Sequence, residues 1–226
     1  MLILPNLNTM LVFPVIHYVD AASALVNAQM AADLGCAGVF LISMIGECDV
    51  IPGAAAKIKE ALPHLWVGIN LLSKSPLTAM KISLEWKLDG TWADQPGVTS
   101  KGADAEAEDV AALLLEHPAH LFFGSIAFKY LTAESCPSTA AVNAMKLGMI
   151  PTTSGTATGK AAPQAKLWSI RRALGDRPLG IASGVTPANV REHAGLVTHV
   201  LVSTGISNGT DDFDRAKLAE LLANAA

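Results

Sequence analysis

Three clusters rich in glycine and hydroxyl residues carry the clearest chemical signal in this chain. They are Thr152–Lys160, Ala182–Val190 and Ser203–Ser207, and each follows a short apolar run. Loops of this composition expose backbone N–H groups, and a helix that begins nearby adds the positive end of its dipole. Three such clusters in succession predict an anion site, and phosphate is the expected anion.

The last two clusters are expected to hold the phosphate. Gly184 and Gly205 have no side chain, so backbone N–H groups beside them can approach an anion closely. Ser183, Ser203 and Thr204 add hydroxyl groups to the same loops. Ser-Gly and Thr-Gly pairs are also ordinary turn signals. Their position after two successive apolar runs is what favours phosphate binding.

The first cluster predicts a lid over the substrate, with Gly155 and Gly159 as hinges. Ser154, Gly155 and Lys160 are candidate substrate-binding residues, and Lys160 would contact either phosphate or only solvent. The run is not a Walker A nucleotide-binding motif, because its glycine spacing differs and no Lys-Ser or Lys-Thr pair follows the glycines.

Short apolar runs alternate with alanine-rich segments in which apolar residues recur every three or four positions. The runs predict strands at Val12–Ile16, Gly38–Ile42, Leu65–Leu71, Gly90–Ala93, His120–Phe123, Met149–Thr153, Leu179–Ala182 and Val200–Val202. The segments predict helices at Ala21–Leu34, Gly53–Leu62, Ser75–Leu88, Ala105–Glu116, Thr139–Leu147, Pro163–Leu174, Ala188–Ala194 and Phe213–Ala223. Asp20 is the expected N-cap of the first helix, and Thr186 with Pro187 is expected to begin the seventh.

Eight strand–helix units in 226 residues predict an α/β fold, a single (β/α)8 TIM barrel. A doubly wound open sheet is the rival architecture, but it usually has fewer strands and a G-x-G-x-x-G after its first strand. No linker rich in proline or serine divides the chain. One domain is therefore expected over residues 1–226.

Two carboxylates are the leading candidates for acid–base catalysis, because such a barrel places its active site at the C-terminal ends of its strands. Asp94 directly follows the predicted strand Gly90–Ala93 and is the stronger candidate. A turn ahead of Pro96-Gly97 is its structural alternative. Glu47 lies in the loop after the second predicted strand, where burial would raise its pKa and a solvated loop edge would not.

Three further polar side chains lie in or after predicted strands. His17 would be a general base or a substrate ligand, since imidazole titrates near neutral pH, or else a structural partner. Lys129 would be a base or Schiff-base nucleophile if desolvated, would bind an anion, or would extend to the surface. Asn70 would orient a polar ligand or join a buried network, because a buried amide needs partners.

Composition excludes several classes of function. The net charge is −4 and the basic residues are scattered, which argues against nucleic-acid binding. No apolar run is long enough to span a membrane and the N-terminus lacks a secretory signal, so a cytoplasmic protein is expected. The three cysteines suggest neither a disulfide framework nor a zinc site. No cofactor is predicted, and a divalent metal held by carboxylates stays an open alternative.

The segments Thr153–Lys160 and Ala182–Val190 together resemble the BtpA/SgcQ family, which is grouped with the ribulose-phosphate-binding barrels. Val67–Leu72 and Asp89–Asp94 look similar but are less diagnostic, and Ser183–Pro187 is shared by several phosphate-binding barrels. The resemblance implies a (β/α)8 barrel and a phosphorylated ligand. It leaves the reaction open, since members are linked to photosystem assembly in one lineage and to nucleosidase or sugar metabolism in others.

The leading hypothesis is an enzyme that acts on a small phosphorylated sugar or phosphoribosyl compound. N-glycosidic cleavage or transfer, isomerisation and aldol chemistry are the reactions considered. A non-catalytic assembly or ligand-binding factor is the alternative from a different class. A third reading is an isomerase like phosphoribosylanthranilate isomerase, with Cys48 and Asp94 as acid and base. The high apolar content favours a homo-oligomer.

Overall fold

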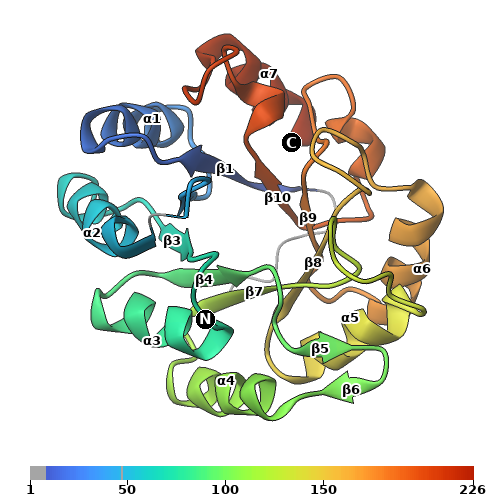
Figure 1. Cartoon of the computed structure of the whole chain (residues 1–226). Coiled ribbons are helices and arrows are strands. Elements are labelled where there is room, and N and C mark those ends of the chain that lie inside the picture. The colour runs from blue at the N-terminus through green and yellow to red at the C-terminus, as the bar shows by residue number, and fades with distance from the viewer. Residues whose placement is uncertain (1–8, 47) are drawn as a thin grey trace.

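Eight parallel strands close into a barrel in the computed structural model, which describes residues 9–46 and 48–226 (Figure 1). The strands are β1 (Leu11–His17), β2 (Val39–Ile42), β3 (Val67–Asn70), β4 (Gly90–Ala93), β7 (Leu121–Ser125), β8 (Ile150–Thr153), β9 (Gly180–Ala182) and β10 (His199–Val202). Their order around the barrel is β1-β10-β9-β8-β7-β4-β3-β2, and β1 pairs with both β10 and β2. The predicted (β/α)8 barrel is confirmed.

Helices surround the barrel (Figure 1). They are α1 (Ala21–Asp33), α2 (Ile51–Ala61), α3 (Pro76–Glu85), α4 (Ala105–Glu116), α5 (Pro137–Lys146), α6 (Gln164–Leu174) and α7 (Arg215–Ala225). Asp20 caps α1 as predicted, since its Oδ1 accepts hydrogen bonds from the N–H groups of Ala22 and Ser23 at 2.8 and 2.9 Å. Within the described residues, no helix has the length and apolar content to cross a bilayer.

The predicted helix Ala188–Ala194 is wrong as an α-helix, because the structure has only a 3₁₀ helix over Val190–His193. Thr186 is not its N-cap: the Thr186 N–H donates to Asn189 Oδ1 at 2.8 Å. The Asn189 amide in turn donates to the Gly184 carbonyl at 2.9 Å. This side-chain turn folds the chain back on itself and competes with the start of a regular helix.

A short hairpin that the sequence pattern did not reveal lies between β4 and α4. It pairs β5 (Val98–Thr99) with β6 (Gly102–Ala103) in antiparallel register. Each strand has only two residues, so the hairpin is too short to produce a readable alternation of apolar and polar positions. It packs beside α5 (Figure 1).

Aromatic rings fill the N-terminal half of the barrel interior. Trp66 lies edge-on to Phe13 and Phe40, with ring centroids 5.1 Å apart in both pairs. Phe123 contacts the same cluster, at 5.2 Å from Phe40. Such tilted arrangements are favourable for aromatic pairs. Because this half is packed solid, any central cavity must lie at the other end, where the strands finish.

Replacing His199 with Gln should flatten the pH dependence of folding stability. His199 is 3% exposed, stacks on Phe13, and burial lowers its pKa from 6.5 to about 4. The unfolded chain therefore binds a proton more readily than the folded chain. The stability that neutral His199 contributes is complete above pH 6.5 and is lost as the pH falls toward 4. Urea unfolding between pH 7 and 4.5 should show the wild type losing about 1.4 kcal/mol per pH unit more than the variant. Equal slopes would contradict the assignment.

Candidate functional site

A cavity of about 420 Å³ opens at the C-terminal mouth of the barrel. Its walls come from the ends of β1, β2, β4, β9 and β10, and from the segments after β7 and β8. This is the end of a (β/α)8 barrel at which active sites are found. The cavity brings together these residues singled out from the sequence: His17, Asp94, Lys129, Ser183, Gly184, Ser203, Thr204 and Gly205.

The loops after β9 and β10 touch backbone to backbone at one side of this cavity. A Cβ on Gly205 would overlap the carbonyl oxygen of Val185, and a Cβ on Gly184 would overlap the backbone of Lys160. Both positions therefore have room for glycine only. Among the described residues, no hydrogen bond uses the backbone N–H of Gly184, Thr204 or Gly205. Three donors beside the cavity are free to meet a ligand.

Asp94 is the one carboxylate among the described residues that line the cavity, and it pairs with Asn70. The Asn70 amide, only 1% exposed, donates to Asp94 Oδ1 at 3.0 Å. Burial raises the pKa of Asp94 above its usual 3.8, while the Asn70 hydrogen bond and the charge of Lys129 act in the opposite direction. A carboxyl group with a raised pKa is suited to proton transfer.

Lys129 lies at the rim, where its ammonium group is already in contact with neighbours. Nζ donates to Thr158 Oγ1 at 3.2 Å and lies 5.8 and 5.9 Å from the ring centroids of Phe128 and Tyr130. The Tyr130 hydroxyl donates to the same oxygen at 3.2 Å. These are contacts that a cation makes. They fit an anion-binding or positioning role better than that of a neutral nucleophile.

Backbone strain gathers around the mouth. Ala127, Tyr130 and Ser183 have positive φ angles of 46°, 62° and 69°, a region that residues other than glycine rarely occupy. Ser183 Oγ accepts a hydrogen bond from the Gly159 N–H at 3.2 Å, which holds the loop after β8 against the loop after β9. Strained residues persist only where their surroundings fix them, and they concentrate at functional sites.

Lys166 on α6 supports this strained region from below, and no sequence signal marked it. Its Nζ donates to the carbonyl oxygens of Ala127, at 3.1 Å, and Ser154. Burial lowers the pKa of Lys166. The side chain is half-buried under the segments that it bonds, and it does not line the mouth cavity. Its role is therefore to hold the backbone after β7 and β8.

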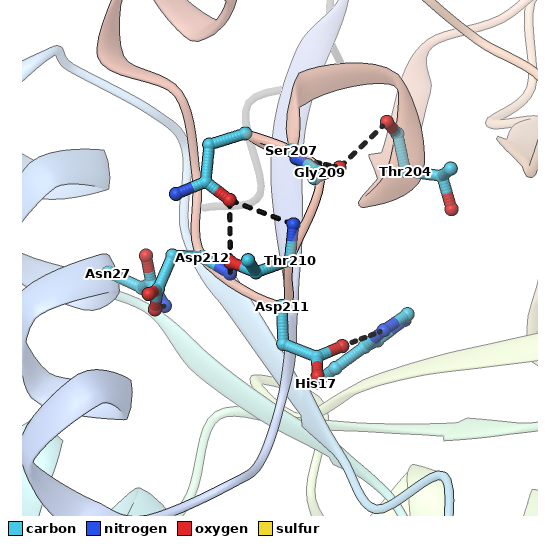
Figure 2. A network of polar contacts seen from close by, with 9 residues as sticks. His17, Asn27, Thr204, Ser207, Gly209, Thr210, Asp211 and Asp212 are labelled. Carbon is cyan, nitrogen blue, oxygen red and sulfur yellow. Dashed lines mark hydrogen bonds and ion pairs between the residues drawn. The ribbon is translucent and has the colours of Figure 1, made fainter.

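His17 ends β1 and faces the loop that precedes α7 (Figure 2). Its Nδ1 lies 3.3 Å from Asp211 Oδ1. Asn27 of α1 anchors the same loop, because its amide donates to Asp212 Oδ1 at 3.1 Å and its oxygen accepts from the Phe213 N–H at 2.9 Å. Asp211 and Asn27 were missed by sequence reasoning, since these contacts join residues more than 180 positions apart.

The proposed lid segment lines the cavity with Thr158 and Gly159, but its candidate substrate-binding residues Ser154, Gly155 and Lys160 do not. Ser154 is fully buried, and its hydroxyl accepts from the Lys129 N–H at 2.8 Å and donates to the Gly155 carbonyl at 2.9 Å. A Cβ on Gly155 would overlap the carbonyl oxygen of Lys160. The Lys160 side chain is exposed and does not line the cavity. These contacts account for Ser154 and Gly155 by packing alone.

Two other candidates, Cys48 and Asn70, do not line the mouth cavity, and the position of a third is not described. Glu47 lies outside the described residues. Cys48 is 2% exposed within the apolar layer beneath α2 and does not line the cavity, so the structure gives no support to its pairing with Asp94. Asn70 lines a neighbouring polar cavity of about 410 Å³, which Asp94 also lines. Asp94 therefore lies between two chambers.

A larger cavity of about 590 Å³ lies between the β5–β6 hairpin and the segment after β7. Its carboxylates already cap backbone groups. Glu134 accepts from the N–H groups of Ser100 and Cys136, both at 3.0 Å, and Asp104 accepts from the Ala107 N–H at 2.9 Å. The central mouth is the better candidate, because Asp94 there is engaged by one side-chain amide only.

In the part of the chain that the structure describes, no group of three or more His, Cys, Asp or Glu side chains is placed to hold a metal ion.

Comparisons with known proteins support the fold but do not identify a family. No family model matches the chain, and no curated protein sequence matches it. Solved structures do match. The phosphoribosyl anthranilate isomerase from Thermus thermophilus is 17% identical, with a TM-score of 0.67 over 95% of this chain and 98% of that chain. The 2-keto-3-deoxy-6-phospho-gluconate aldolase from Zymomonas mobilis is also 17% identical, with a TM-score of 0.65 over 97% and 93%.

The phosphoribosyl anthranilate isomerase from Thermotoga maritima gives the same result, at 15% identity and a TM-score of 0.65 over 96% and 98% of the two chains. The neighbours are thus isomerases and aldolases whose names refer to phosphorylated compounds. At this level of identity the likeness establishes a shared barrel architecture.

Replacing Gly184 with Ala should cost far more stability than replacing Gly195 with Ala. Both glycines have φ near +72°, but only Gly184 has backbone where a Cβ would lie. The Gly195 change should cost about 1–2 kcal/mol for the left-handed conformation, and the Gly184 change a further 1–3 kcal/mol for overpacking. Chemical denaturation measures both. Equal losses would mean that the loops after β8 and β9 are not in close contact.

Proposed function

We propose that this protein is an enzyme that acts on a small phosphorylated sugar or phosphoribosyl compound by acid–base chemistry. The phosphate would be held by the loops after β9 and β10, with Gly184, Thr204 and Gly205 donating backbone hydrogen bonds and Ser183 and Ser203 adding hydroxyls. One observation carries the proposal: free backbone donors and a carboxyl group of raised pKa line the same cavity. Backbone N–H groups in glycine loops are well suited to phosphate.

Asp94 is the proposed general acid or base, oriented by Asn70. A carboxyl group whose pKa is raised by burial can protonate a leaving group or transfer a proton between neighbouring carbons. This favours N-glycosidic cleavage or transfer, or isomerisation, over Schiff-base aldol chemistry, which needs a neutral Lys129. His17 would contact the substrate from the end of β1, and Lys129 would stabilise negative charge at the rim.

The resemblance to the BtpA/SgcQ family is part of this proposal and agrees with the barrel architecture. We also propose a cytoplasmic location, one domain over the whole chain, and a homo-oligomer. Association is supported by exposed apolar side chains on the outer helices and the segments that end them. Trp86, Leu115 and Trp168 are 47%, 84% and 56% exposed. Side chains of this size on the outside of a barrel are suited to burial between subunits.

A non-catalytic binding factor is the second candidate, because large apolar side chains surround the mouth. Met44, Ile45 and Tyr130 are 58%, 79% and 74% exposed. Such residues could form a contact surface for a partner molecule that docks over a bound phosphorylated ligand. This alternative predicts phosphate binding without turnover, and the proposed enzyme predicts both.

Inorganic phosphate should bind to the protein and perturb three backbone amides. In a titration followed by two-dimensional NMR, the N–H signals of Gly184, Thr204 and Gly205 should shift, while that of Gly195, away from the mouth, should stay. Gly205→Ala should weaken phosphate binding at least about tenfold, because the added methyl group pushes the loops apart. Gly53→Ala in α2, where an added Cβ would make only ordinary contact with Trp86 at 3.8 Å, is the matched control. Unshifted signals at all three amides would overturn the phosphate site.

Asp94→Asn should strongly reduce turnover and spare phosphate binding. The substrate would first be identified by mass spectrometry of ligand that co-purifies with the protein. General acid–base catalysis contributes about 10²–10⁴-fold, so kcat should fall by at least about a hundredfold while the phosphate Kd changes less than about twofold. If Asp94 is the acid, the wild-type rate falls as pH rises through its raised pKa, and the variant lacks this limb. Full activity in the variant would exclude Asp94 from the chemistry.

A further inference from the structure

The two sides of the mouth cavity differ in chemistry. The side formed by the loops after β9 and β10 carries hydroxyls and free backbone N–H groups. The opposite side is formed by the ends of β2 and β4 and the segments after β3 and β7, and it contributes the aromatic rings of a cavity whose lining is mostly apolar. Its apolar lining residues are Ile42, Met44, Leu72, Trp92, Phe128 and the ring of Tyr130.

Aromatic rings form the fixed part of the apolar side. Trp92 and Phe128 are 6% and 5% exposed, and their rings meet edge to face with centroids 6.0 Å apart. The Trp92 indole N–H donates to Ser125 Oγ at 2.9 Å, so it is not available to a ligand. What Trp92 offers to the cavity is ring surface, held in place by this hydrogen bond and by Phe128. Tyr130 adds a third ring at the rim.

The polar side chains near these rings already have partners within the protein. Lys129 Nζ and the Tyr130 hydroxyl both donate to Thr158 Oγ1. His17 pairs with Asp211. On this side, only Asp94 offers a carboxylate oxygen to a ligand. Its Oδ1 accepts from Asn70, and its second oxygen is the one available to the cavity. An extended polyol chain would therefore bury several hydroxyl groups with few partners, which is unfavourable.

We propose that the ligand is a phosphate ester that carries a flat aromatic ring, with the phosphate at the loops after β9 and β10 and the ring against Trp92 and Phe128. This inference rests on the proposed phosphate site and narrows its substrate class from sugar phosphates in general to aryl or heteroaryl phosphate compounds. Asp94 lines the same cavity as the rings, where its carboxyl group can donate a proton to, or accept one from, the atom that joins the ring to the phosphorylated part.

Four probes test the preference by isothermal titration calorimetry: inorganic phosphate, ribose 5-phosphate, phenyl phosphate and phenol. Phenyl phosphate should bind at least about tenfold more tightly than ribose 5-phosphate, because ring stacking and apolar burial add to the phosphate contacts. Phenol alone should bind weakly, since it lacks the anion. In a parallel NMR titration, phenyl phosphate should shift the indole N–H signal of Trp92 and leave that of Trp168, on the outer face of α6, unchanged.

A matched pair of variants locates the effect. Phe128→Leu keeps an apolar side chain but removes the ring, and it should reduce the advantage of phenyl phosphate over ribose 5-phosphate by at least about threefold without changing the affinity for inorganic phosphate. Phe122→Leu is the control, because Phe122 is buried on β7 in the layer outside the barrel interior. It should leave the ratio as in the wild type.

The outcomes separate this inference from the proposed function. Binding of inorganic phosphate with phenyl phosphate no tighter than ribose 5-phosphate overturns the aromatic preference and leaves the phosphate site standing. Failure of all three phosphates to bind overturns both. An advantage for phenyl phosphate that persists in Phe128→Leu, with no shift at Trp92, places the ring elsewhere and also overturns the inference.

Discussion

The structure depends on the aromatic packing that fills one half of the barrel interior. The ring centroid of Trp66 lies 5.1 Å from those of Phe13 and Phe40. Phe123, on the opposite strand β7, packs against the same rings. A barrel of eight strands has an interior that side chains can fill. Because large rings occupy the N-terminal half, the central cavity formed by the described residues lies where the strands end. The position of the mouth cavity is thus a consequence of core packing.

A second constraint acts at the mouth itself, where successive loops pack through their backbones. Gly155 and Gly184 both lie against the backbone of Lys160, and Gly205 lies against Val185. Each contact needs a residue without a Cβ. The sequence predicted Gly184 and Gly205 as phosphate-binding residues and Gly155 as a substrate-binding residue. Close packing requires glycine at these positions. The free backbone N–H groups of the same loops remain able to donate hydrogen bonds to a ligand.

The electrostatics of the site follow from the position of Asp94. It lies where the apolar half of the mouth meets a polar side chamber, so burial raises its pKa, while Asn70 holds one carboxylate oxygen. The cations nearby are engaged differently: Lys129 contacts aromatic rings at the rim, and Lys166 bonds carbonyl oxygens below the surface. A carboxyl group of raised pKa in a largely apolar chamber is an arrangement suited to proton transfer.

The sequence alone determined the strand count, the barrel and the strand ends at which Asp94, Gly184 and Gly205 lie, because apolar periodicity and glycine positions are local signals. It failed at Thr186, where an asparagine turn replaced a helix, and at the β5–β6 hairpin, which is too short to show a pattern. Only the tertiary structure decided which candidates meet. It joined His17 to Asp211 and Asn70 to Asp94, and it buried Ser154 and Cys48 away from the mouth. The reason is physical: His17 meets Asp211 because closure of the barrel sets β1 beside β10, and Asn70 meets Asp94 because β3 pairs with β4.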